Sequence, residues 1–378
     1  MMKKNKPTIL ILGCGSCQLE AIQRVLRMGF RTAVASNDPV CPGRSSADIF
    51  LPVSTFDAQG IRKAAEEIRA DGILAVGTDQ PVAVAAAVSE ELGLPSFLSS
   101  EAALNVTNKK RMKSLLADRN IPMNRYRICT LESLETAAKD LKSPYVVKPL
   151  DSQGQRGVYL AETVTEAAVR ARETLSFSRE GELCIEEYYP SGEITASCWS
   201  LKGELFLLSA TDRSSFFPPP YIGICNAHLF PTRFLPGLTE EIYDLCRRSA
   251  GALGITDGPV YVQLLHGKGG LRVNEIAARI GGAYEDVFIP RIEGFDILEA
   301  NIHGVLGEMI EPPSRRIFSL PPKIYITSQL FYLRPGKVRT VTPPEELRGF
   351  PGVVEIFTGI RPGNAAHPIV SSSQRAGF

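Results

Sequence analysis

A lysine at the end of an apolar run, with a glycine-bearing turn directly after it, could bind phosphate. Lys148 lies in the run YVVKPL, and residues 151–157 follow as Asp-Ser-Gln-Gly-Gln-Arg-Gly. Small residues let backbone N–H groups approach a phosphate closely, and a lysine that leaves a strand supplies a fixed positive charge. The segment lacks the Gly-Lys-Ser/Thr ending of a Walker loop. It predicts either a phosphate-binding turn of another kind or an ordinary β-hairpin turn with an exposed lysine.

A second pattern, CIEEYYPSGE at residues 184–193, suits a nucleoside. Two glutamates end an apolar run, two tyrosines follow, and Glu193 stands beyond a Pro-Ser-Gly turn. A strand edge that leads into a linker can offer backbone groups to an adenine, and a carboxylate beyond the turn can accept hydrogen bonds from both ribose hydroxyls. The alternative is a solvated acidic strand end.

Oxygen ligands for a divalent cation are expected on two later strands. Gln263 in VYVQLL and Glu275 in RVNEIAARIGG stand on runs that a short Lys-Gly-Gly turn would pair. On antiparallel neighbours such residues can face the same side and hold Mg²⁺ together. Arg279 follows Glu275 by four residues and could then meet a phosphate. A surface ion pair of Glu275 with Arg279 is the simpler alternative.

The first turn of the chain carries a weaker pattern. Gly13 and Gly15 follow the run TILIL, as in a dinucleotide-binding turn, and Asp38 lies at a suitable distance for a ribose carboxylate. Gln18 stands where the third glycine of that pattern belongs. We therefore expect a tight turn between strand and helix that binds no nicotinamide cofactor.

The order of apolar segments predicts three domains that position these groups. Residues 1–98 alternate short apolar runs with amphipathic stretches, which indicates a Rossmann-like parallel sheet covered by helices. Residues 99–190 predict linker helices and a small α+β unit. Residues 191–378 carry long apolar runs and two helices, near 240–252 and 297–306, which favours an antiparallel sheet with a β-rich tail.

Composition excludes several classes of protein. Within the 378 residues, 42 Lys and Arg balance 41 Asp and Glu, so no charge excess indicates nucleic acid or a membrane surface as a partner. Residues 214–232 form a long uncharged stretch, but prolines within it argue against a membrane span. We interpret it as a loop, within a segment 212–233 that could cover a substrate. Eight scattered cysteines, including Cys14 and Cys17, suit reduced structural thiols and a cytoplasmic protein.

Taken in this order, the motifs resemble those of the ATP-grasp superfamily of carboxylate-amine ligases over nearly the whole chain. The resemblance implies an α/β and α+β architecture: an N-terminal Rossmann-like pre-ATP-grasp domain, a small lid domain and a C-terminal antiparallel-sheet domain. The segment TNKKRMKSLLADRNIP is similar to the lysine-bearing segment of that superfamily. The resemblance implies these ATP-binding residues: Lys109, Lys148, Ser152, Gly154, Gly157, Glu186, Glu187, Tyr189 and Glu193.

The implied roles follow the order of the motifs. Residues 152–157 would be the mobile phosphate lid. Glu187 and Tyr189 would offer backbone atoms to adenine, Glu186 would line its pocket, and Glu193 would hold the ribose.

The metal end departs from the pattern of the superfamily. An acidic residue is usual where Gln263 stands, and Ala277 replaces the usual Asn of a Glu-x-Asn-x-Arg motif. Glu275 then becomes the main protein ligand of Mg²⁺ or Mn²⁺, with Gln263 beside it, and phosphates supply most of the remaining coordination.

The reaction implied by the resemblance is attack of a carboxylate on the γ-phosphate of ATP, followed by displacement of phosphate by an amine. Arg279, Lys148 and Arg156 are the implied catalytic residues, because the task is positioning and charge neutralisation. His228 and Arg291 are candidate substrate-binding residues. A homodimer is the expected assembly.

Three other interpretations remain open at the level of sequence. One is a carboxylase-type member of the superfamily that uses bicarbonate. Another is a degenerate member that binds nucleotide without turnover, which Gln263 and Ala277 suggest. The third is an NAD-dependent dehydrogenase.

Overall fold

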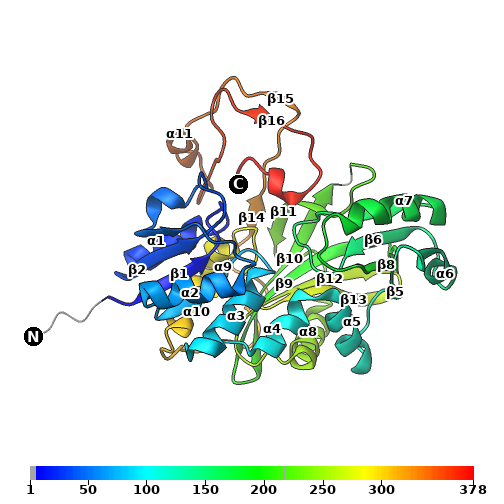
Figure 1. The fold of residues 1–378 in the computed structure, drawn as a ribbon, viewed down its shortest axis with the longest axis horizontal. Coiled ribbons are helices and arrows are strands. Elements are labelled where there is room, and N and C mark those ends of the chain that lie inside the picture. Colours follow the sequence, from blue (N-terminus) through cyan, green and yellow to red (C-terminus); the bar gives the residue numbers. More distant parts are fainter. Residues whose placement is uncertain (1–5, 217) are drawn as a thin grey trace, which may run out of the picture.

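Four parallel strands form the first sheet, and helices pack on it (Figure 1). The computed structural model describes residues 6–216 and 218–378. The first strand is buried along its whole length, as expected where helices cover a parallel sheet. This confirms the parallel sheet predicted from the first apolar runs. In the order β3-β2-β1-β4, the sheet comprises β1 (Thr8–Leu12), β2 (Arg31–Ala35), β3 (Ile49–Leu51) and β4 (Gly72–Leu74), accompanied by α1 (Leu19–Arg27), η1 (Arg44–Ser46), α2 (Ala58–Ile68) and α3 (Pro81–Leu92).

A smaller antiparallel sheet follows after two capped helices. The side chain of Ser99 caps the first helix and that of Asn108 caps the second, so that Lys109 becomes the first residue of the second helix. The sheet has the strand order β5-β8-β6-β7 and its own apolar core. This region comprises α4 (Ser100–Thr107), α5 (Lys109–Asp118), β5 (Tyr126–Cys129), α6 (Leu134–Lys139), β6 (Tyr145–Pro149), β7 (Tyr159–Ala161), α7 (Val164–Leu175) and β8 (Leu183–Glu187).

A six-stranded antiparallel sheet, in the order β13-β12-β9-β10-β11-β14, forms the largest layer. The helices predicted near 240–252 and 297–306 are confirmed, and their observed bounds differ from the predicted ones by at most one residue. The largest apolar core joins this sheet to the first one, because it contains Ile9 and Val34 as well as Trp199 and Ile276. The elements are β9 (Ser191–Leu201), β10 (Glu204–Phe216), β11 (Ile224–Phe230), α8 (Thr239–Leu253), β12 (Gly258–Gly267), β13 (Gly270–Ala277), α9 (Glu285–Glu293), α10 (Ile297–Val305) and β14 (Ile326–Gln329).

The prediction of a loop at residues 214–232 is wrong. β10 continues to Phe216, β11 begins at Ile224, and the two strands pair antiparallel. Most side chains of β11 are buried, so the absence of charge reflects a place inside the sheet. The prolines lie at 218–220, between the strands, and at 231, directly after β11, where they remove no hydrogen bond from the ladder.

The β-rich tail was also overestimated. After β14 the described chain forms only short regular elements, because many of its residues are exposed and prolines and glycines interrupt its pattern. The chain then turns back, and the Ser372 N–H donates to the Gly154 carbonyl at 3.0 Å. The boundaries between the three proposed domains stay a prediction. The elements are β15 (Gly336–Lys337), α11 (Pro344–Arg348), β16 (Ala365–Ala366) and η2 (Ser372–Gln374).

None of the helices in the described part of the chain is long and apolar enough to cross a membrane.

Candidate active site

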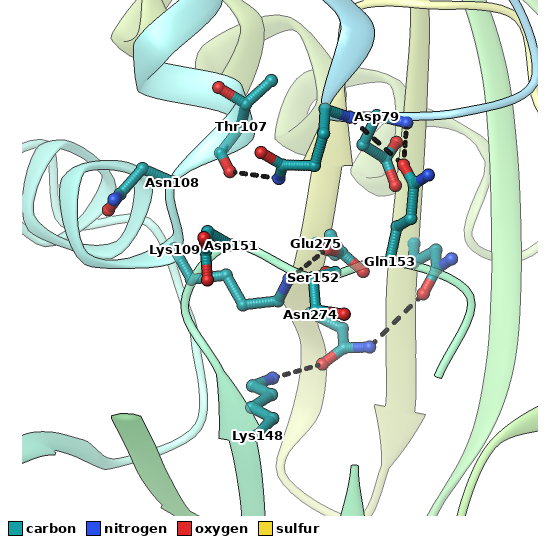
Figure 2. Close-up of polar contacts among 12 residues, drawn as sticks. Asp79, Thr107, Asn108, Lys109, Lys148, Asp151, Ser152, Gln153, Asn274 and Glu275 are labelled. Carbon is teal, nitrogen blue, oxygen red and sulfur yellow. Dashed lines mark hydrogen bonds and ion pairs between the residues drawn. The ribbon is translucent and has the colours of Figure 1, made fainter. Parts of the chain in front are cut away.

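A cavity between the small sheet and the six-stranded sheet collects most of the residues that the sequence singled out. The lid residues 152–155 lie at its edge. Figure 2 shows Lys109, Lys148 and Glu275 converging there from α5, β6 and β13. Its lining includes Lys109, Lys148, Ser152, Gly154, Glu186, Tyr188, Tyr189, Glu193, Arg213, Gln263, Asn274 and Glu275.

Lys109 connects the start of α5 to the far side of the cavity. Its Nζ lies 2.8 Å from Glu275 Oε1 and donates to the carbonyl of Ser152 at 3.1 Å. The side chain is buried, and the backbone N–H of Lys109 donates to the Leu150 carbonyl at 3.0 Å. The lysine therefore joins the lid loop to the proposed metal ligand.

Lys148 leaves β6 and contacts two different groups. Its Nζ lies 2.6 Å from Glu186 Oε1 and donates to Asn274 Oδ1 at 3.4 Å. Asn274 in turn donates through Nδ2 to Gln263 Oε1 at 3.4 Å. A chain of polar contacts thus runs from Lys148 to the metal end of the cavity (Figure 2).

Glu186 is a buried carboxylate that pairs with two lysines, Lys148 and Lys113. Lys113 lies 2.9 Å from its other carboxylate oxygen, and only 2% of Glu186 is exposed. Burial by itself would raise the pKa of Glu186, but Lys113 and Lys148 outweigh it and lower the pKa to about 2. The sequence analysis missed Lys113. Its spacing of four residues from Lys109 on one helix was the available signal.

Gln263 and Glu275 lie directly opposite each other on β12 and β13, as the spacing predicted. The register shifts next to this pair, because Leu264 pairs with Val273 and leaves Asn274 as an extra residue. This β-bulge brings both Asn274 and Glu275 to the cavity wall, although neighbours on a regular strand point to opposite faces. Asn274 was not singled out from the sequence.

The metal end offers oxygen atoms from one carboxylate and two amides, a set that suits a hard cation such as Mg²⁺. Burial would raise the pKa of Glu275, but the charge and hydrogen bond of Lys109 lower it, so the carboxylate is ionised. Among the described residues, no group of three or more His, Cys, Asp and Glu side chains could hold a metal. Glu275, Gln263 and Asn274 would therefore need further oxygen ligands from a bound molecule in order to hold such a cation.

Arg279 is buried and paired with an acid that the sequence analysis missed. Its Nε donates to Asp79 Oδ1 at 2.7 Å, and its guanidinium lies 4.6 Å from the centre of the Tyr261 ring. The backbone N–H groups of Asp79 and Gln80 donate to the Oε1 atom of Gln153 in the lid. The loop after β4 thus connects Arg279 to the lid.

The lid has the backbone geometry of a phosphate-binding turn. Gly154 and Gly157 have φ angles of +66° and +73°, which favour glycine. A Cβ at Gly154 would meet nothing within 4 Å, so this backbone is open to a ligand. Asp151 anchors the start of the loop, with Ser178 Oγ at 2.6 Å and Arg179 Nε at 2.9 Å.

The adenosine end is only partly as expected. Tyr189 lines the cavity, but Glu187 does not, since its carboxylate contacts Arg125 and the Lys142 N–H outside it. The backbone N–H of Glu187 already donates to the Arg125 carbonyl, so only its carbonyl could meet a base. Tyr188, which also lines the cavity, was missed.

Glu193 lines the same cavity but is not free. Its carboxylate forms an ion pair with the buried Arg213 and accepts a hydrogen bond from Ser215 Oγ at 3.2 Å. Arg213 was missed, because it lies in the stretch beside the supposed loop. A ribose at Glu193 would therefore meet a carboxylate that is already oriented.

The remaining candidate residues lie in different parts of the structure. Arg156 and His228 line a second cavity beside the first. Arg291 does not reach either one: it lies on α9, where its guanidinium donates to the Val287 carbonyl. It lines two other cavities, so its proposed role in substrate binding stays a prediction that the first two cavities do not support.

The Gly13 turn is filled from within. Gln18 Nε2 donates to the Val76 carbonyl at 2.7 Å, and Gln18 Oε1 accepts from the Gly15 N–H at 3.0 Å. Gly13 has a φ of +112°, and a Cβ there would lie 3.0 Å from the Gln18 side chain. Gln18 thus uses a backbone donor that a dinucleotide phosphate would need.

No protein-family model matches the chain. Among curated proteins, an L-arginine-specific L-amino acid ligase of Bacillus subtilis is 25% identical over 290 residues, covering 72% of this chain and 66% of that protein. The chain spans 46% to 66% of the lengths of the first four curated relatives.

Solved structures match over almost the whole chain. An L-amino acid ligase from Bacillus licheniformis superposes with a TM-score of 0.82 at 19% identity, covering 99% of this chain and 93% of that one. An ADP complex of an N5-carboxyaminoimidazole ribonucleotide synthetase gives a TM-score of 0.73 at 16% identity, covering 100% and 93%. Both comparisons establish a shared fold.

Proposed function

Because the chain has the ATP-grasp fold of the carboxylate-amine ligases, we propose that it is itself an ATP-dependent ligase of this class. It joins a carboxylate to an amine, through an acyl phosphate, with release of ADP and phosphate. Its substrates resemble amino acids, in keeping with the L-amino acid ligases to which it is similar. The protein acts in the cytoplasm as a homodimer.

One observation carries this proposal: Lys109, Lys148 and Glu275 meet in a single cavity that a glycine-bearing lid borders. These residues are far apart in the sequence. Two lysines and an ionised carboxylate suit the phosphates of ATP and one divalent cation. The alternative of a hairpin turn with an exposed lysine does not explain why Lys148 is 5% exposed and paired.

The roles of the chain's own groups follow from their positions. Lys109 and Lys148 neutralise phosphate oxygens, and Ser152, Gly154 and Gly157 bring lid backbone to them. Glu186 orients Lys148, Tyr189 offers backbone atoms to the base, and Glu193 holds the ribose. Arg279 and Arg156 face the transferring phosphoryl group.

The metal end completes the proposal. Mg²⁺ or Mn²⁺, when bound, would neutralise charge on the phosphate oxygens. Glu275, Gln263 and Asn274 would hold it. The substitution of an acid by Gln263 leaves Glu275 as the single protein carboxylate, so the metal depends strongly on the nucleotide for its remaining ligands.

Bond formation balances without a protein nucleophile. A substrate carboxylate oxygen attacks the γ-phosphorus, and the bond to the ADP oxygen breaks. The amine nitrogen then attacks the acyl carbon, phosphate leaves with the electrons of its C–O bond, and the amine loses a proton to solvent. Positioning and charge neutralisation are the contributions of the protein.

The test is nucleotide product analysis with purified protein, ATP, Mg²⁺ and either pooled amino acids or bicarbonate. Amino-acid-dependent ADP and phosphate are expected. Bicarbonate-dependent ADP would favour the carboxylase type instead. AMP and pyrophosphate would exclude the acyl-phosphate route, and ATP binding without turnover in any pool would indicate a protein that only binds nucleotide.

A further inference from the structure

A second cavity, of about 340 Å³, adjoins the nucleotide cavity at its metal end. The two share the lid residues 153–155 together with Arg213, Gln263 and Glu275. A molecule in the second cavity would therefore lie next to the phosphates. Its other walls come from the turn after β1, the loop after β4, strands β11 and β12, the segment after β13 and the C-terminal segment. They include Cys17, Asp79, Arg156, His228, Arg279 and Arg375.

Positive charge in this cavity exceeds what the protein balances. Arg213 pairs with Glu193 and Arg279 pairs with Asp79. The part of the chain that the structure describes pairs neither Arg156 nor Arg375 with a carboxylate, and Glu275 is already matched by Lys109. A cation on a cavity wall without a carboxylate partner is suited to an anion from outside the protein.

Arg375 is held in position by neutral groups. One guanidinium nitrogen donates to the Gly282 carbonyl at 2.5 Å, another contacts the Cys17 sulfur, and the group lies 5.3 Å from the centre of the Tyr284 ring. Ser372, three residues earlier, hydrogen-bonds to Gln155 of the lid at 2.8 Å. The cation is thus oriented and close to the lid.

His228 supplies an independent indication of a ligand. Only 1% of it is exposed, and its Nε2 has no hydrogen-bond partner. Thr211 Oγ1 lies 3.0 Å from His228 Nδ1 and 3.3 Å from the Thr195 carbonyl, so the hydroxyl can donate to either group or accept a hydrogen bond from Nδ1. Burial and Arg213 lower the pKa of His228 to about 3, which keeps the ring neutral. Nε2 is therefore a buried polar atom on the cavity wall that a hydrogen-bonding group of a ligand would satisfy.

Resting on the ligase function proposed above, we infer that this cavity binds the amine substrate as an amino acid. Arg375 faces the carboxylate of that amino acid, and His228 Nε2 forms a hydrogen bond with its amino group. The reacting carboxylate of the other substrate belongs on the Arg279 and Glu275 side. Free amino acids are thereby preferred to their amides as acceptors.

Cys17 provides a readout that does not need turnover. It lines the cavity beside Arg375, and it is half-buried whereas the other seven cysteines are buried. Its alkylation by iodoacetamide can be followed by mass spectrometry. The protein is incubated with Mg²⁺, a non-hydrolysable ATP analogue and each L-amino acid, and the amino acid that protects best is compared with its amide.

The wild type should need about tenfold more amide than amino acid for half-protection, equivalent to ~1.4 kcal/mol. Arg375→Gln should raise the concentration of amino acid needed for half-protection but not that of amide, which abolishes the difference. Arg375→Lys should restore part of the difference. Arg361→Gln, in the same tail but exposed, should change nothing. His228→Leu should weaken protection by both ligands, since both carry the amino group. For each variant, the rate of Cys17 alkylation with ligand is compared with the rate of the same variant without ligand.

The outcomes separate this inference from the ligase function. Equal protection by the amino acid and its amide, or an unchanged difference in Arg375→Gln, would overturn the role of Arg375. Amino acids that stimulate ADP formation without protecting Cys17 would overturn the cavity assignment and leave the function standing. Protection without any nucleotide turnover would support the cavity and contradict the ligase function.

Discussion

Lys148 and Glu186 form an ion pair of 2.6 Å in which both residues are more than nine-tenths buried. Lys113 contacts the second oxygen of the same carboxylate at 2.9 Å. One buried negative charge thus holds two buried lysines, and the surplus positive charge faces the nucleotide cavity through Lys148. The burial of these charges makes the cluster sensitive to the loss of any member.

We expect Glu186→Gln to lower the free energy of unfolding by about 3 kcal/mol, because two buried ammonium groups lose their counter-charge. Urea unfolding measures this change. Glu182→Gln is the matched control: it removes the partner of Lys110 in an exposed pair and should have little effect. Equal stability of the two variants would contradict the structural role of Glu186.

Acid should destabilise the protein through Glu186. Its pKa of about 2 lies below the ordinary value of 4.5, so the folded state binds the proton more weakly than the unfolded state. The stabilisation is present above about pH 4.5 and is lost as the pH falls towards 2. Unfolding free energies measured across this range should show a shallower slope for Glu186→Gln than for the wild type. Parallel curves would show that Glu186 isn't the responsible group.

Arg279→Ala should lower kcat by about 10²-fold or more and change KM for ATP far less, because its charge acts on the transferring phosphoryl group. Steady-state kinetics with the amino acid that supports turnover provides the measurement. Asp79→Asn retains the arginine and should have a much smaller effect. An Arg279→Ala protein with unchanged kcat would remove Arg279 from the transition state.

Gln263→Glu should strengthen metal binding, since it restores a second carboxylate opposite Glu275. The Mg²⁺ concentration for half-maximal turnover should fall by about tenfold, and Glu275→Gln should raise it strongly. Titration of ATP turnover with Mg²⁺ tests both variants. If Gln263→Glu leaves the Mg²⁺ dependence unchanged, residue 263 doesn't ligate the metal.

Local pattern was sufficient for much of the fold. The run TILIL predicted a parallel strand, and residues 99–190 predicted linker helices, one of which is the helix that starts at Lys109. The position of Lys148 before a glycine-bearing turn and the spacing of Gln263 and Glu275 identified residues that line one cavity. Strand alternation and a short turn fix which residues of β12 and β13 stand opposite each other. These features depend on contacts between residues near in sequence.

Residues 214–232 show where pattern fails. A stretch without charge and with prolines reads as a loop, yet most of it forms β10 and β11, because the neighbouring strands supply hydrogen bonds that the sequence does not display. The contacts of Arg213 and His228, which lie on these strands, could therefore not be predicted from the sequence.

The sequence by itself determined the kinds of groups available and their order: two lysines, a glycine-bearing turn, an acidic strand end and a pair of side chains with oxygen atoms. Only the tertiary structure decided that Lys113 neutralises Glu186, that Asp79 pairs with Arg279, that a bulge turns Asn274 into the cavity, and that Arg375 returns to Cys17. Apart from the bulge, each of these contacts joins segments that are distant in the chain. Such contacts arise from the packing of whole sheets and loops against each other, and local periodicity carries no record of that packing.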